Sequence, residues 1–160
     1  MILAIECVVF CLIMWLICFL GTGNDEKNFK SINAYPDEVV EIVKNHDNYK
    51  DRYKSDNQIV KFISNLIVFL VILLVFGIFI RTGNVVTNFL SILLIGEMAN
   101  LFDLLVIDML WWRNIKRIRF SFIPEKEKYK SMKKHLISFV KGAVMFLIVA
   151  LIDGAILILF

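Results

Sequence analysis

Four long apolar runs constrain the fold of this chain more than any other feature of its sequence. The runs are residues 2–20, 59–80, 85–112 and 136–160. Each is long enough to cross a hydrocarbon layer of ~30 Å as a helix, which takes about 18 residues or more at ~1.5 Å per residue. Transmembrane strands need alternating polarity, whereas these runs are almost continuously apolar. The sequence therefore predicts an all-α membrane protein, a bundle of four transmembrane helices in a single domain over residues 1–160.

The first run could be a signal peptide or a retained anchor. No basic residue precedes its apolar stretch and no small-x-small cleavage site follows it, so we expect it to be retained. Its three cysteines, Cys7, Cys11 and Cys18, are spaced by four and seven residues and therefore share one stripe of a helix. We interpret this stripe as a packing face, with palmitoylation of Cys18 as the alternative.

The basic residues between the runs predict the orientation of the helices. Residues 21–58 and 113–135 are long loops rich in Lys and Arg, whereas the connection 81–84 is short and has one basic residue. By the positive-inside rule, both long loops are cytoplasmic and both chain ends lie on the outer side. We expect a multi-pass integral protein of the cell membrane, with an external turn for which Gly83 and Asn84 offer a backbone with positive φ.

The first loop contains a short amphipathic pattern. Pro36 followed by Asp37 and Glu38 is typical of a first helical turn, because proline fits there and acidic side chains favour the positive end of the helix dipole. The apolar stripe from Val39 to Val43 then predicts a short cytoplasmic helix. We expect this stripe to pack on the protein, with contact to the membrane surface as the alternative.

Aromatic and basic side chains are interleaved where the third run ends and the second loop begins. These residues are Trp111, Trp112, Arg113, Lys116, Arg117 and Arg119. Rings and cations suit the headgroup layer, so we interpret the set as a contact with anionic membrane lipid, with a passive topology signal as the alternative. The same residue types can bind nucleic acid, but the set directly adjoins two spans, so we expect no nucleic-acid partner.

Polar residues inside the last two runs are the strongest functional candidates. They are Glu97, Asn100, Asp103, Asp108, Lys141 and Asp153. A charge at the centre of a transmembrane helix costs ~2.5–3.5 kcal/mol, so these groups must face protein or water. Counting from the cytoplasmic ends predicts an ion pair between Asp108 and Lys141 and permits a contact between Glu97 and Asp153. Asp103 has no predicted partner and is the best candidate for a titrating group.

The sequence carries no motif for a metal, a cofactor or soluble catalysis. His46 and His135 have no second histidine or cysteine at ligand spacing, so we expect no metal site and interpret both as solvated or interfacial side chains. Walker, nucleophile-elbow and dinucleotide-binding motifs are absent, so we assign no catalytic residue and no cofactor.

Three functions are compatible with these features. The first is a small subunit or accessory protein of a membrane complex, which binds lipid and a membrane protein partner or a second copy of the chain. The second is an oligomeric transporter coupled to protons or cations through the intramembrane acids. The third is a lipid-modifying enzyme with Asp108 and His135 as general acid or base. The lack of catalytic motifs beside many intramembrane polar groups favours the first.

Overall fold

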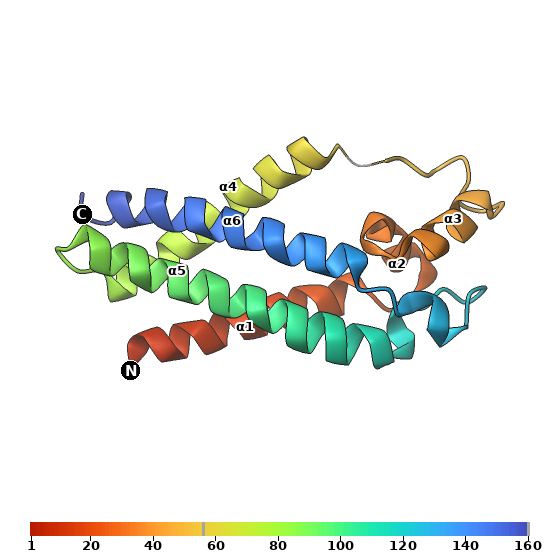
Figure 1. Ribbon diagram of the computed structural model, residues 1–160, viewed down its shortest axis with the longest axis horizontal. Helices are drawn as coiled ribbons and strands as arrows, with labels where there is room; N and C mark the ends of the chain where they lie inside the picture. Colours follow the sequence, from red (N-terminus) through yellow and green to blue (C-terminus); the bar gives the residue numbers. More distant parts are fainter. Residues whose placement is uncertain (56, 160) are drawn as a thin grey trace.

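Four helices dominate the computed structural model, which describes residues 1–55 and 57–159 and contains no strand within them (Figure 1). They are long and apolar enough to cross a bilayer, which confirms the prediction of four apolar helices of that length. They are α1 (Ile2–Gly21), α4 (Gln58–Ile80), α5 (Val85–Phe102) with its continuation η2 (Asp103–Trp112), and α6 (Lys133–Ile156). Phe160 of the fourth predicted span and Asp56 of the first predicted loop lie outside the described residues.

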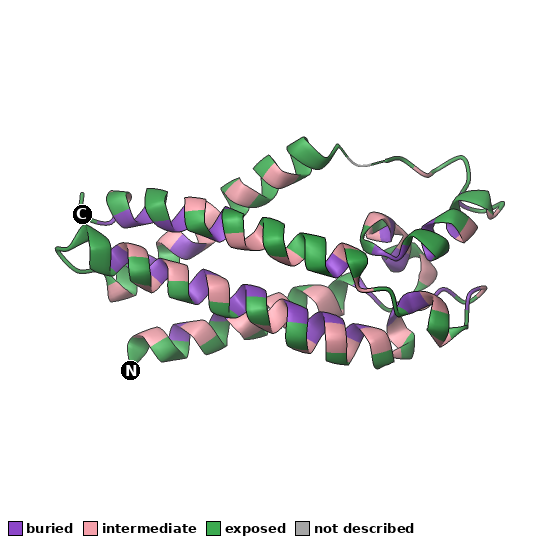
Figure 2. Cartoon of the chain, in the orientation of Figure 1, coloured by how far each residue is buried: buried purple, intermediate pink, exposed green. Residues whose placement is uncertain are grey.

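The two central helices of the bundle are α5 and α6, which run antiparallel and share the largest interface. The outer helices are α1, which packs mainly on α5, and α4, which packs mainly on α6. Their outward faces are exposed and apolar (Figure 2). Figure 1 also shows that α4 diverges from α6 towards one end of the bundle. This divergence leaves the two helices in contact only along part of their length.

Both chain ends and the turn between α4 and α5 lie at the same end of the bundle (Figure 1). The buried side chain of Asn88 closes this turn, because its Nδ2 donates to the carbonyl oxygen of Thr82 at 2.9 Å and its Oδ1 accepts from the Thr82 N–H at 2.7 Å. The predicted positive φ at Gly83 and Asn84 is wrong, since Gly23 is the only described residue with such a backbone. The hydrogen bonds of the Asn88 side chain, rather than a residue with positive φ, stabilise the reversal of the chain here.

Two glycines allow α5 and α6 to approach closely. A Cβ atom added at Gly96 would lie 2.7 Å from Cδ1 of Phe146, and one added at Gly154 would lie 2.9 Å from Cα of Phe89. Both distances are too short for a side chain, so each glycine accepts a neighbouring residue directly against its helix backbone. Together they define the axial register of the antiparallel pair.

A cap covers the end of the bundle opposite the chain ends, and it consists of residues 22–55 and 113–132. Its short helices are α2 (Asp25–Lys30), η1 (Ile32–Ala34), α3 (Asp37–Asn45), η3 (Lys116–Ile118) and η4 (Lys126–Tyr129). Tyr35 is at the centre of the cap core, with the rings of Trp112, Phe120 and Tyr129 around it. Because Trp112 belongs to η2, the long third helix extends out of the bundle and into the cap.

The short helix predicted in the first loop is confirmed as α3. It begins at Asp37, directly after Pro36. Val39, Val40 and Val43 are buried in the cap core, so the apolar stripe packs on the protein as expected.

Two buried tyrosines satisfy backbone groups inside the cap. The hydroxyl of Tyr35 donates to the carbonyl oxygen of Ile118 at 2.9 Å. The hydroxyl of Tyr129 donates to the carbonyl oxygen of Ile123 at 3.0 Å and accepts from the Phe120 N–H at 3.1 Å. The two tyrosine hydroxyls therefore bind polar backbone groups of the second loop within the cap core.

Alkaline titration is expected to unfold the cap. Burial raises the pKa of Tyr129 from 10.0 to about 12 and also raises the pKa of Tyr35. Because the folded pKa lies above the unfolded value, this contribution to stability is complete below pH ~10 and is lost as the pH rises towards about 12. Tyrosinate absorbance and near-ultraviolet circular dichroism should therefore change together. Ionisation of both phenols near pH 10 with no loss of tertiary signal would contradict the buried placement.

Candidate functional site

The predicted intramembrane polar residues are spread along the seam where α5 and η2 meet α6. Asn100 donates from Nδ2 to the carbonyl oxygen of Phe139 on α6 at 3.1 Å and to Oε2 of Glu97 at 3.3 Å. Its Oδ1 lies against Gly142, where any side chain would collide with it. A buried amide therefore links Glu97 to the backbone of the facing helix.

Asp108 and His135 form a buried pair at the cap end of this seam. His135 Nδ1 lies 2.8 Å from Asp108 Oδ2, and the two side chains are only 7% and 12% exposed. The interpretation of His135 as a solvated side chain is therefore wrong. The indole ring of Trp112 lies against His135, with 6.1 Å between ring centroids, so the pair also contacts the base of the cap.

The predicted ion pair between Asp108 and Lys141 is also wrong. Asp108 has His135 as its partner, and Lys141 Nζ instead donates to Oε1 of Gln58 on α4 at 3.2 Å. The prediction placed the ends of the third and fourth spans at the same level. Because the third helix extends into the cap, each of its residues faces a position of α6 that lies closer to the start of α6 than the prediction placed it.

The permitted contact between Glu97 and Asp153 fails for the same reason. Gly96 packs on Phe146, so Glu97 lies at the level of that ring. Asp153 comes seven residues later on α6, about 10 Å along the axis, at the level where Gly154 packs on Phe89. Asp153 is fully buried, and neither carboxyl oxygen has a hydrogen-bond partner among the described residues.

Asp103 is the first residue of η2, the π-helical segment. A π-helix has i→i+5 hydrogen bonds, so Asp103 lies one turn before Asp108 on the same side of the segment. The structure thus places Asp103 one helical turn from the pair of Asp108 and His135. It leaves Glu97 with Asn100, Lys141 with Gln58, and Asp153 at the far end of the seam.

The residues predicted to contact lipid headgroups lie mostly within the cap. The set comprises Trp111, Trp112, Arg113, Lys116, Arg117 and Arg119. Trp112 is buried and Trp111 half-buried, while Lys116 is exposed. The three arginines each donate to a backbone carbonyl oxygen, that of Lys130, Phe19 or Pro124. Their described contacts hold the second loop on α1 and on itself.

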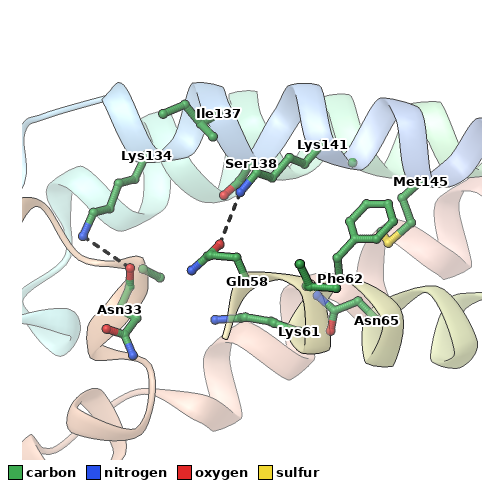
Figure 3. A pocket seen from close by; sticks show the side chains of 13 residues that line it. Asn33, Gln58, Lys61, Phe62, Asn65, Lys134, Ile137, Ser138, Lys141 and Met145 are labelled. Carbon is green, nitrogen blue, oxygen red and sulfur yellow. Dashed lines mark hydrogen bonds between the residues drawn. The ribbon is translucent and has the colours of Figure 1, made fainter. Parts of the chain in front are cut away.

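A lateral cleft of about 600 Å³ opens between α4 and α6 where the two helices diverge (Figure 3). Its size is within the range of ~300–1,000 Å³ that small-molecule sites occupy. The lining residues are Asn33, Ala34, Gln58, Ile59, Lys61, Phe62, Asn65, Lys134, Ile137, Ser138, Lys141, Gly142 and Met145. Three of them are lysines, and none of the described lining residues is acidic. We refer to this space as the α4–α6 cleft.

Polar contacts are concentrated at the cap end of the α4–α6 cleft. Lys134 Nζ lies 2.9 Å from Oδ1 of Asp37 on α3 and 3.4 Å from the carbonyl oxygen of Asn33. Lys141 extends from deeper in α6 towards Gln58 at the start of α4 (Figure 3). Deeper in the cleft, the apolar side chains of Phe62 on α4 and Met145 on α6 lie beside the polar side chain of Asn65. The cleft is therefore cationic at its mouth and more apolar further in.

Sequence reasoning missed the α4–α6 cleft, although a signal for it exists. Each of the two helices carries a polar stripe of three residues spaced by three or four positions. The stripes are Gln58, Lys61 and Asn65 on α4, and Lys134, Ser138 and Lys141 on α6. Such spacing places each stripe on one helix face. What the spacing could not reveal is that the two faces are opposite each other.

Comparison of the chain with protein-family models, with curated proteins and with solved structures gave no match.

Proposed function

We propose that this chain is a multi-pass membrane protein that binds an anionic membrane lipid in the α4–α6 cleft. The observation that supports this most is the cleft's lining, which combines three lysines with the apolar side chains of Phe62 and Met145 further in and has no described carboxylate. An anionic lipid has the complementary arrangement, a negative headgroup on apolar chains. Each lysine near such a headgroup contributes about 1 kcal/mol.

The position of the α4–α6 cleft suits entry of a lipid from the side. Because α4 diverges from α6, an acyl chain can lie between them beside Phe62 and Met145. The headgroup then lies at the level of Lys61 and Lys134, near the starts of the two helices. Lys141 originates deeper but directs its ammonium group towards Gln58, as long basic side chains do at membrane interfaces.

In this proposal the cap is cytoplasmic, as the positive-inside rule predicts, and both chain ends are on the outer side of the cell membrane. The protein acts as a subunit or accessory component of a membrane complex rather than as an enzyme. The partner is another membrane protein or a second copy of the chain. The seam offers less support for coupled transport, because Glu97 and Asp153 lie at separate levels with different neighbours and Asp108 is paired with His135.

Neutralising two cleft lysines tests the lipid site. Lys61→Gln with Lys141→Gln is expected to weaken binding of phosphatidylglycerol by about tenfold or more, since two contributions of about 1 kcal/mol are removed. Native mass spectrometry of the detergent-purified protein, titrated with this lipid, measures the bound fraction. Lys134 is left in place because it also pairs with Asp37 in the cap.

A second double variant controls for net charge. Lys126→Gln with Lys130→Gln removes the same charge from the cap, where these lysines contact Asn114 and Glu127 outside the cleft. This variant is expected to bind the lipid as the unaltered protein does. Equal weakening by both double variants would mean that only overall charge matters, and no weakening by the cleft variant would reject the site.

A further inference from the structure

We infer that the α4–α6 cleft selects anionic phospholipids whose headgroup carries no amine, such as phosphatidylglycerol, over phosphatidylserine of the same net charge. This inference rests on the proposed function and specifies its ligand. A serine headgroup brings a phosphate and a carboxylate together with an ammonium group. The cleft must then accommodate a cation as well as anions.

The α4–α6 cleft offers little to a cation. An ammonium group is stabilised by a carboxylate or by several aromatic faces, and no described lining residue is acidic while Phe62 is the only aromatic one. Three lysines are present instead, so the ammonium would be placed among like charges. Repulsion between like charges within a few ångströms disfavours that headgroup. A glycerol headgroup brings hydroxyls, which match the neutral side chains of Gln58 and Ser138.

A carboxylate that contacts one of the cleft lysines lies just outside the α4–α6 cleft. Asp37 lies outside the lining, on α3, and its Oδ1 is 2.9 Å from Lys134 Nζ. The hydrogen bond and charge of Lys134 hold the pKa of Asp37 below its usual range, so Asp37 is ionised at neutral pH. It therefore competes with a bound phosphate for Lys134. Removing this carboxylate should release Lys134 to the headgroup.

The lipid comparison is made with matched chains and matched net charge. Phosphatidylglycerol and phosphatidylserine with identical acyl chains are titrated into the unaltered, detergent-purified protein, and native mass spectrometry gives both dissociation constants. We expect phosphatidylglycerol to bind about tenfold more tightly. Asp37→Asn is expected to tighten phosphatidylglycerol binding a further two- to fivefold. The expected gain is modest because the Asp37 side chain is 74% exposed.

Glu38→Gln is the matched control for Asp37→Asn. Glu38 is the next residue of α3 and pairs with Lys128 at 3.1 Å, and neither residue lines the α4–α6 cleft. This variant removes the same charge from the same helix turn and is expected to leave both dissociation constants unchanged. An equal gain from both variants would show that Lys134 is not the residue through which Asp37 acts.

The outcomes separate this inference from the proposed function. Equal binding of the two lipids, with both weakened by Lys61→Gln/Lys141→Gln, would overturn the selectivity and leave the lipid site standing. If Asp37→Asn weakened the binding of phosphatidylserine but not that of phosphatidylglycerol, Asp37 would be shown to accept the ammonium group. This result would also overturn the inferred selectivity. Binding of neither lipid would reject the proposed function itself.

Discussion

Replacing His135 by leucine is expected to lower the free energy of unfolding by about 1–3 kcal/mol, the usual cost of leaving a buried polar group without its hydrogen-bond partner. The carboxyl group of Asp108 would remain buried at the contact between η2 and α6 without the imidazole that now lies 2.8 Å from it. Leucine is close to histidine in size, so lost packing contributes little. Denaturation in mixed micelles, followed by circular dichroism, measures the change.

The double variant Asp108→Leu/His135→Leu distinguishes a coupled pair from two independent side chains. Because apolar residues often replace a buried pair with little net cost, the double variant should be more stable than either single variant. The coupling free energy should be about 1 kcal/mol or more. Simple additivity of the two single effects would contradict the pairing.

His46→Leu is the control for general effects of removing a histidine. His46 is half-buried on the cap surface, where its ring stacks on Phe122 with 3.9 Å between centroids. Leucine keeps most of this contact, so a change below about 1 kcal/mol is expected. A loss as large as that of His135→Leu would mean that neither effect reports on the buried pair.

The helices were predictable from the sequence because span length and continuous hydrophobicity are properties of each segment alone. The start of α3 was predictable for the same reason, since Pro36 and the acids after it act locally. The axial register of α5 and α6 was not predictable from these signals. It depends on which side chain enters which gap, as Phe146 does at Gly96 and Phe89 at Gly154.

The error in register changed the partners predicted for the intramembrane polar residues. The predicted depths start at the end of the third apolar run, and this run includes Trp112 because tryptophan is common at membrane interfaces. In the structure Trp112 is instead part of the cap core. The loop aromatics Tyr35, Phe120 and Tyr129 were the available signal for such a core, since solvated loops seldom need large buried rings.

The α4–α6 cleft was the least predictable feature of the candidate site. It exists because α4 diverges from α6, and this depends on the packing of both helices against their neighbours. The polar stripes on the two helices were visible in the sequence, but Lys141 was assigned to an ion pair inside the bundle. Only the three-dimensional arrangement shows Lys141 directed towards Gln58 on the other side of α6.

Replacing Asp153 by valine is expected to raise the free energy of unfolding by about 1–3 kcal/mol, in contrast to the loss at His135. Asp153 is 0% exposed, and both of its carboxyl oxygens lack a hydrogen-bond partner among the described residues. A buried polar group without a partner costs free energy that an apolar side chain of similar size does not. The same denaturation in mixed micelles measures the change.

Asp153→Asn provides the comparison that identifies the cause. Asparagine has nearly the same volume and keeps two polar atoms in the same place, so its stability should remain close to that of aspartate. A gain with valine and none with asparagine would show that the unpartnered polar atoms, rather than the packing around α6, limit stability. A loss with valine would show instead that the carboxyl group has a stabilising partner, such as bound water, a cation or another chain.

The sign of this effect also bears on coupled transport, the second function considered for this chain. If valine stabilises the chain, the carboxyl group of Asp153 costs stability, as residues at functional sites often do. If Asp153 binds a proton or cation during transport, Asp153→Val should be more stable and yet inactive in proton uptake by proteoliposomes. If the unaltered protein shows no proton uptake in proteoliposomes and Asp153→Val is still more stable, lipid binding in the α4–α6 cleft is the better-supported function.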